Sequence, residues 1–180
     1  VVFSKYPSCI SGPFDQVDLR ATQGDDEAEL VVAIGRTTRD VAAEDSWSYV
    51  AGLMVGQDIS DRELQLGARP PQFGLGKSRD TYGPIGPVLV SPDSFADPDN
   101  LGITCDVNGE RRQDARTSSL IFDVSFLVSY LSSVLTLVPG DLIFTGTPAG
   151  VGMADGRFLK PGDVVTTSIE GIGTMKNVCQ

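Results

Sequence analysis

The chain contains 180 residues, of which 41% are hydrophobic and 21% are charged, so it is long enough for one globular domain with a sizeable core. Its formal net charge of −10 disfavours nucleic acids and anionic membrane surfaces as partners, because both are bound by basic surfaces. No apolar stretch approaches the roughly 18 residues of a membrane-spanning helix, and the start VVFSKYPSCISG lacks the pattern of a signal peptide.

The predicted elements are mainly strands, separated by frequent glycines and prolines. In chain order, we predict a buried strand over 30–34, a short helix over 42–54, and an apolar strand from 53 that stops at Asp58. A strand within 83–91 and a hairpin around Asn108-Gly109 follow. The clearest helix is predicted over 118–135, with an apolar stripe that core packing explains: Leu120, Val124, Leu127, Val128, Leu131 and Leu135.

A weak internal repeat lies near the end of the chain. The segments LVPGDLIFTGTPAGVG (137–152) and LKPGDVVTTSIEGIG (159–173) both place a Pro-Gly-Asp turn before a strand rich in β-branched residues. We interpret them as two similar hairpins in one curved sheet. Many strands and two helices, without regular alternation of the two, favour the α+β class over a doubly wound fold.

Three carboxylates stand at the ends of predicted apolar strands. Glu27 and Glu29 are two residues apart, so on a strand they share one face at roughly 6 to 7 Å, and Asp58 ends the next strand. They either lie in water on an exposed edge or converge around a cation that relieves their repulsion. The chain has no histidine and three widely spaced cysteines, which indicates reduced thiols and no zinc site. An oxygen-only site would take Mg²⁺, Mn²⁺ or Ca²⁺.

Basic and polar residues follow these strands. Arg62 and Gln65 are three residues apart and share one face if that stretch is helical. Lys77 lies in the sequence GKS, but a phosphate-binding loop needs glycine where this chain has Pro71, so that interpretation fails. Taken alone, Arg62 and Lys77 have the character of surface charges.

The ordered set of motifs is similar to the fumarylacetoacetate hydrolase family, in particular its small-hydrolase branch. The motifs are EAELVVAIG, VGQDISDRELQ, GKSRDTYGPIGP, VNGERRQDARTSSLIFDV, PGDLIFTGTPAGVG and LKPGDVVTTSIEGIGTMKN, and they cover nearly the whole chain. The resemblance implies a mixed β-roll with a few helices, a homodimer and an enzyme that acts on a small-molecule keto acid. The reduced thiols indicate a cytoplasmic protein, and the acidic charge predicts no nucleic-acid or membrane partner.

The resemblance also assigns roles to residues. It implies that Glu27, Glu29 and Asp58 bind Mg²⁺ or Mn²⁺. It further implies that Arg62, Gln65 and Lys77 hold the oxygens of a keto acid, that Lys77 stabilises the developing enolate, and that Thr147 binds a substrate carboxylate.

Hydrolysis of a C–C bond in acylpyruvates or β-diketo acids is the reaction we expect from this resemblance. Decarboxylation or isomerisation of oxaloacetate-like 2-oxo acids passes through the same kind of enolate and is the alternative, as is a catalytically weak relative that binds metal and keto acid. Hydrolytic relatives activate water with a His-Glu pair from an upstream segment, and this chain has no histidine.

Two departures from the family pattern, the missing histidine and the residue at position 26, lead to further expectations. We expect residues 1–180 to be the catalytic domain of a longer protein whose N-terminal segment and lid are not in this sequence; the alternative is that the full protein lacks the His-Glu pair and has no such means of activating water. We interpret Asp26, which stands where relatives often have an aromatic residue, as facing solvent on the other side of its strand.

Overall fold

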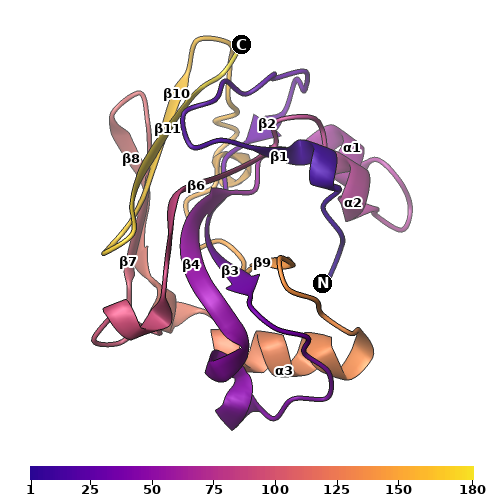
Figure 1. The fold of residues 1–180 in the computed structure, drawn as a ribbon. Coiled ribbons are helices and arrows are strands. Elements are labelled where there is room, and N and C mark those ends of the chain that lie inside the picture. Colours follow the sequence, from indigo (N-terminus) through magenta and orange to yellow (C-terminus); the bar gives the residue numbers. More distant parts are fainter.

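Two β-sheets pack against each other in the computed structural model, which describes residues 1–180 (Figure 1). One has five strands in the order β1-β6-β4-β3-β9, the other has four in the order β11-β10-β7-β8, and β2 pairs with β5. The strands are β1 (Ile10–Ser11), β2 (Gly24–Asp25), β3 (Ala28–Ile34), β4 (Val50–Gln57), β5 (Ser60–Asp61), β6 (Gly83–Val90), β7 (Gly102–Val107), β8 (Glu110–Arg116), β9 (Leu142–Phe144), β10 (Val164–Ile169) and β11 (Gly173–Val178).

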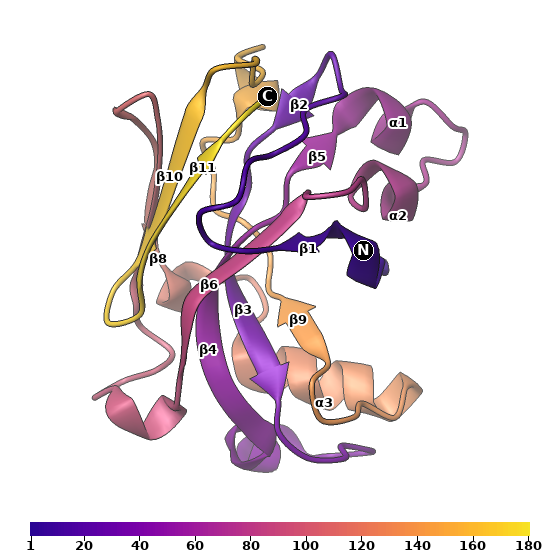
Figure 2. The same ribbon diagram turned by 45° about the horizontal axis from the view of Figure 1, so that its top comes forward.

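Helices are few and lie at the ends of the sheets (Figure 2). The α-helices are α1 (Arg62–Leu66), α2 (Phe73–Gly76) and α3 (Val124–Val134), and the 3₁₀ turns are η1 (Pro7–Cys9), η2 (Ala43–Tyr49), η3 (Pro92–Ser94), η4 (Thr117–Ser119) and η5 (Gly152–Ala154). Strand β1 runs parallel to β6 and the other ladders are antiparallel, so the fold is the mixed α+β roll that the sequence predicts. No helix combines the length and the apolar character needed to cross a membrane.

Strand β3 is the central element of the larger sheet, and all seven of its residues are buried. Leu30 and Val32 belong to the apolar core that both sheets share. Glu29 and Val31 alternate with them and therefore point to the opposite face. Sequence reasoning predicted this strand correctly, and the period of two places Glu29 away from the core.

The predicted helix over 42–54 is wrong in its second half. The 3₁₀ turn η2 ends at Tyr49, and strand β4 begins at Val50. The apolar residues of this stretch fit a helical spacing by coincidence. Pairing of β4 with both β3 and β6 outweighs that local pattern, because it satisfies the backbone hydrogen bonds of the strand on both sides.

Helix α3 is shorter than predicted, because it begins where the Asp123 carboxylate caps it by accepting the Phe126 N–H at 2.7 Å. Val124 and Val128 are buried, whereas Leu135 is 53% exposed, so only part of the predicted apolar stripe packs in the core.

Two further predictions concern turns near the chain's second half. The hairpin of β7 and β8 is confirmed, and Asn108 and Gly109 both have positive φ at its turn. The proposed pair of hairpins in one sheet is wrong, because β9 pairs with β3 in one sheet and β10 pairs with β7 and β11 in the other. A shared Pro-Gly-Asp turn determines only the local geometry of the chain. Which strand pairs with β9 or β10 depends on strands that are distant in the sequence.

Candidate metal centre

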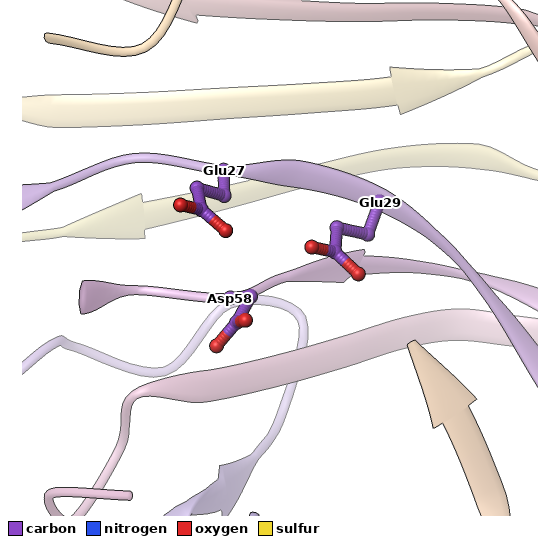
Figure 3. A group of neighbouring side chains, drawn as sticks. All are labelled: Glu27, Glu29 and Asp58. Atoms are coloured by element: carbon purple, nitrogen blue, oxygen red, sulfur yellow. The ribbon is translucent and has the colours of Figure 1, made fainter. Parts of the chain in front are cut away.

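Three carboxylates meet on the face of the larger sheet that points away from the core (Figure 3). Glu27 and Glu29 reach from β3 and its approach, and Asp58 follows the last residue of β4. One oxygen from each lies within 4.8 Å of the others, and all three residues are buried. The Asp58 N–H donates to the Glu27 carbonyl at 2.9 Å, so the backbone ladder itself holds these strand ends together.

Glu29 is the least compensated of the three carboxylates. Burial, followed by the charges of Asp58 and Glu27, raises its pKa well above the usual value of 4.5. Its side chain accepts one hydrogen bond, from the Gly146 N–H at 2.8 Å. A buried carboxylate with so few donors is costly unless it is protonated or faces a cation. This donor set therefore fits a hard divalent cation such as Mg²⁺ or Mn²⁺, which prefers carboxylate oxygens.

Two buried lysines contact the same carboxylates. Lys77 Nζ lies 2.5 Å from Glu27 Oε2 and 2.9 Å from Asp58 Oδ2. Burial acts to lower the pKa of Lys77, but the charges of Asp58 and Glu27 outweigh it and raise the pKa. Lys5 Nζ lies 2.6 Å from Asp58 Oδ1 and also donates to the Lys77 and Tyr82 carbonyls. The raised pKa keeps Lys77 charged at this site, and Lys5 brings a second basic side chain to Asp58.

Arg62 is buried at the start of α1 and faces the same group. Its guanidinium contacts Glu27 Oε1 at 2.6 Å and donates twice to Asp25 Oδ2, at 2.9 and 2.7 Å. It also donates to the side-chain amide oxygen of Gln65 at 2.9 Å, so the two residues share one helix face as predicted. The Gln65 amide nitrogen has no partner in the chain and is free to donate to a ligand.

Thr147 lies beside this site, in the loop after β9. Its hydroxyl donates to the Ala28 carbonyl at 2.8 Å and accepts from the Gln113 amide at 2.8 Å. A hydroxyl has one hydrogen, so this side chain must release Ala28 before it can donate to a substrate carboxylate. The structure brings Thr147 to the site, and its contact with substrate stays a prediction.

A cavity of about 360 Å³ opens next to the same loop. It lies against Gly146 and Thr147 and extends over Leu120 and Phe122. None of the three carboxylates lines it, although the Gly146 N–H binds Glu29. Gly146 therefore contacts both the cavity and the candidate metal centre.

The expectation that Asp26 faces solvent is wrong. Asp26 is fully buried, and its carboxylate lies 2.7 Å from Arg112 Nη1. Burial raises the pKa of Asp26, and the Arg112 charge opposes that effect. The alternation along the strand does place Asp26 opposite its neighbour Glu27, but the second sheet covers that side.

Several residues that support the site escaped sequence reasoning. Asp25 opens the acidic run at 25–29 that leads into the buried strand, so the sequence could have marked it as a candidate together with Glu27 and Glu29. No local pattern singles out Lys5, since its partners are 53 to 77 residues away. The same holds for two fully buried glutamines, Gln57 and Gln113, whose amide oxygens accept the N–H groups of Glu27 and Ala28 at 2.9 Å each.

Comparisons with known proteins show similarity in sequence and in fold. The oxaloacetate tautomerase FAHD2B, mitochondrial, of Bos taurus is 44% identical over 181 residues, covering 98% of this chain and 58% of the relative. The solved fumarylacetoacetate hydrolase EaFAH of the psychrophile Exiguobacterium antarcticum has a TM-score of 0.95 at 42% identity, covering 100% of this chain and 66% of that chain. The solved fumarylpyruvate hydrolase of Pseudomonas aeruginosa, in complex with Mn²⁺ and pyruvate, has a TM-score of 0.88 at 32% identity, covering 98% and 77%.

These similarities run the length of the chain. The chain spans about three fifths of the curated relatives that it matches. The family model described as fumarylacetoacetate (FAA) hydrolase C-terminal matches residues 1–180. With the fold, the buried carboxylates and this match in agreement, the chain belongs to the fumarylacetoacetate hydrolase family.

Proposed function

We propose that residues 1–180 form the catalytic domain of a divalent-metal-dependent enzyme that stabilises the enolate of a small 2-oxo acid or β-diketo acid. The observation that carries this proposal is the buried triad of Glu27, Glu29 and Asp58, with one oxygen from each within 4.8 Å. A cation held by these residues would supply Lewis-acid stabilisation of negative charge on a chelating substrate. The Mn²⁺ and pyruvate bound to the Pseudomonas aeruginosa relative support this assignment.

The protein's own residues add two contributions at this site. Lys77 holds a buried ammonium group beside Glu27 and Asp58, and such a charge stabilises an oxyanion without reorganisation. The Gln65 amide nitrogen is held in place by the Arg62 contact with its oxygen, so its two hydrogens are oriented for an acceptor. We assign Lys77 to the developing enolate oxygen, Gln65 and Arg62 to the keto-acid oxygens, and Thr147 to the substrate carboxylate.

Three reactions are compatible with these roles. Hydrolysis of a C–C bond in an acylpyruvate is the first, and the fumarylpyruvate hydrolase relative supports it. It requires a base for water, and the chain contains no histidine. Tautomerisation of oxaloacetate is the second, supported by relatives at 44% identity that carry that name. Tautomerisation moves a proton through an enolate and consumes no water. Decarboxylation is the third, because it passes through the same kind of enolate.

Thermal melting tests the metal site before any reaction is assigned. We expect Mn²⁺ or Mg²⁺ to raise the melting temperature of the chain, and oxalate, a planar mimic of a 2-oxo acid enolate, to raise it further. Glu29→Gln should abolish both shifts. Glu63→Gln is the matched control, because it removes an exposed carboxylate on the neighbouring helix. An unchanged melting temperature with either metal in the parent chain would refute the proposal.

Direct assays then separate the reactions. Enol absorbance reports tautomerisation of oxaloacetate, and loss of the acylpyruvate chromophore reports C–C cleavage. Faster tautomerisation without cleavage assigns a tautomerase, cleavage assigns a hydrolase, and oxalate binding without either assigns a catalytically weak relative.

Two further expectations belong to the same proposal. We expect a homodimer, which sedimentation of the chain would test. We keep a cytoplasmic location as the first hypothesis, with a mitochondrial one as the alternative because the Bos taurus relative is named as mitochondrial. Imaging of the tagged full-length protein in its own cells decides between them.

A further inference from the structure

On its β9 side, strand β3 lacks a neighbouring strand beside Ala28 and Glu29, although β4 pairs with these residues on the other side. Strand β9 pairs with β3 only from Val31 to Ala33, and the Thr145 N–H then donates to the Leu30 carbonyl at 3.1 Å. Beyond that point the edge of β3 at Ala28 has no backbone partner on this side. Ala28 is fully buried, so its N–H and carbonyl need other partners.

Two side chains take the place of the missing strand. The Gln113 amide oxygen accepts the Ala28 N–H at 2.9 Å, and the Thr147 hydroxyl donates to the Ala28 carbonyl at 2.8 Å. The Gln113 amide nitrogen donates to the Thr147 hydroxyl at 2.8 Å and to the Pro148 carbonyl at 2.9 Å. Ala28, Gln113 and Thr147 therefore form a closed ring of hydrogen bonds, which we call the Ala28 brace.

The chemistry of the ring explains why a glutamine stands at its centre. The Gln113 amide must accept from one group and donate to two others, and among uncharged side chains only an amide offers one carbonyl and two N–H donors. A carboxylate could not donate to Thr147, and an apolar side chain could do neither. Gln113 is fully buried, so water cannot replace the lost contacts at low cost.

Ala28 lies between two of the three proposed metal ligands. Any shift of its backbone moves Glu27 and Glu29 together, relative to Asp58. We propose that Gln113 is a positioning residue of the metal centre, and that the Thr147 hydroxyl holds Ala28 with it. This inference rests on the proposed function for the metal, while the brace itself is independent of it.

The inference changes the expected role of Thr147. If this side chain only contacted a substrate carboxylate, its loss would weaken binding of the substrate and leave the metal affinity unchanged. In the brace, its single hydroxyl hydrogen is committed to Ala28, so its loss weakens binding of the metal itself. Metal affinity without substrate therefore distinguishes the two roles.

Calorimetric titration of the chain with Mn²⁺ provides the first test. We expect Gln113→Leu and Thr147→Val to weaken Mn²⁺ binding about 10- to 100-fold, the usual effect of losing a group that orients a ligand. Thr147→Ser keeps the hydroxyl and should bind Mn²⁺ within about threefold of the parent, by the same reasoning. Val165→Ala is the control for stability, because Val165 is buried on β10 in the other sheet. It should melt earlier and bind Mn²⁺ normally.

Hydrogen exchange of the metal-free chain provides the second test. The Ala28 amide should exchange faster in Gln113→Leu than in the parent, relative to other amides of β3, and should not do so in Val165→Ala. Thr147→Val carries the binding test on its own if Gln113→Leu does not fold.

The outcomes separate the two proposals. A parent chain that binds no Mn²⁺ refutes the proposed function, and the exchange of Ala28 still decides whether the brace exists. A parent that binds Mn²⁺, with Gln113→Leu or Thr147→Val binding it equally well, overturns the positioning role and leaves the proposed function standing.

Discussion

Arg112 Nη1 lies 2.7 Å from Asp26 Oδ1 in the interior of the protein, where the aspartate is fully buried. The two residues come from different sheets, since Arg112 is on β8 and Asp26 leads into β3. This ion pair therefore ties the strand that carries the proposed ligands to the smaller sheet. A second hydrogen bond from Arg112 to the Arg157 carbonyl, at 2.9 Å, extends the connection.

Loss of one partner of that pair should be costly. Arg112→Leu leaves the Asp26 carboxylate buried without a counter-charge, and we expect a loss of about 3–5 kcal/mol in the free energy of unfolding, measured with urea. Combining it with Asp26→Asn should restore more than half of the loss. Arg111→Leu is the matched control, because that neighbour is half exposed and its ion pairs contribute about 1 kcal/mol or less. A loss below 1 kcal/mol in Arg112→Leu would contradict the assigned role.

Lys77→Met should separate stability from turnover. Without a metal, this variant leaves Glu27 and Asp58 facing each other with one ammonium group fewer. We therefore expect its free energy of unfolding, measured with urea in EDTA, to be about 3 kcal/mol lower than that of the parent. Mn²⁺ should restore most of that stability while turnover stays low, because the charge that meets the enolate is gone. Lys160→Met, at an exposed position, serves as the control. Parent-like turnover in Lys77→Met would remove this lysine from the mechanism.

The pH dependence of the metal-free chain should report on Glu29. Burial and the charges of Asp58 and Glu27 raise its pKa, so the folded chain keeps this proton to a higher pH than the unfolded chain. Its contribution to stability is therefore lost as the pH rises from 4.5 through the folded pKa. The glutamine in Glu29→Gln does not titrate. In EDTA, the free energy of unfolding of this variant should therefore rise relative to that of the parent across that pH range and be the larger of the two at pH 7. The reverse order at pH 7 would show that Glu29 is compensated by another group.

The cysteines should be unreactive in the folded state. Burial raises the pKa of Cys179 to about 12, and it also raises the pKa values of Cys9 and Cys105. At pH 8 only about one Cys179 thiol in ten thousand is ionised. Iodoacetamide should therefore label the native chain very slowly, and it should label all three thiols rapidly once the chain is unfolded in guanidinium. Because the unfolded thiols ionise first, the same groups lower stability as the pH rises from 9 toward 12. Rapid native labelling would contradict this burial.

The predicted carboxylate triad shows what local sequence patterns can locate. Glu27 and Glu29 follow from the period of two on a strand, and Asp58 follows from the end of the next apolar run. Each signal lies within a few residues, and the antiparallel pairing of β3 with β4, which sets Ala28 opposite Gln57, brings the carboxylate-bearing strand ends together. Asp26 has the same local signal as Glu27, yet its environment depends on Arg112, 86 residues away. Local spacing carries no information on that partner.

The same distinction applies to the fold. The hairpin at Asn108-Gly109 was predictable, because its turn requires positive φ at two consecutive residues. The helical spacing from Trp47 to Met54 was misleading, because pairing with β3 and β6 decides the conformation of β4. Gln113 could not be singled out at all, since its role exists only where β8 passes the end of a three-residue strand.

The short length of β9 also bears on aggregation. A strand edge with unpaired backbone groups becomes a template for pairing with a strand of another chain whenever local opening exposes it. Gln113 and Thr147 occupy the hydrogen-bonding groups of Ala28 at that edge, so an incoming backbone finds neither a donor nor an acceptor. The two side chains that hold the backbone between the proposed ligands therefore also protect this edge of the larger sheet against addition of a strand from another chain.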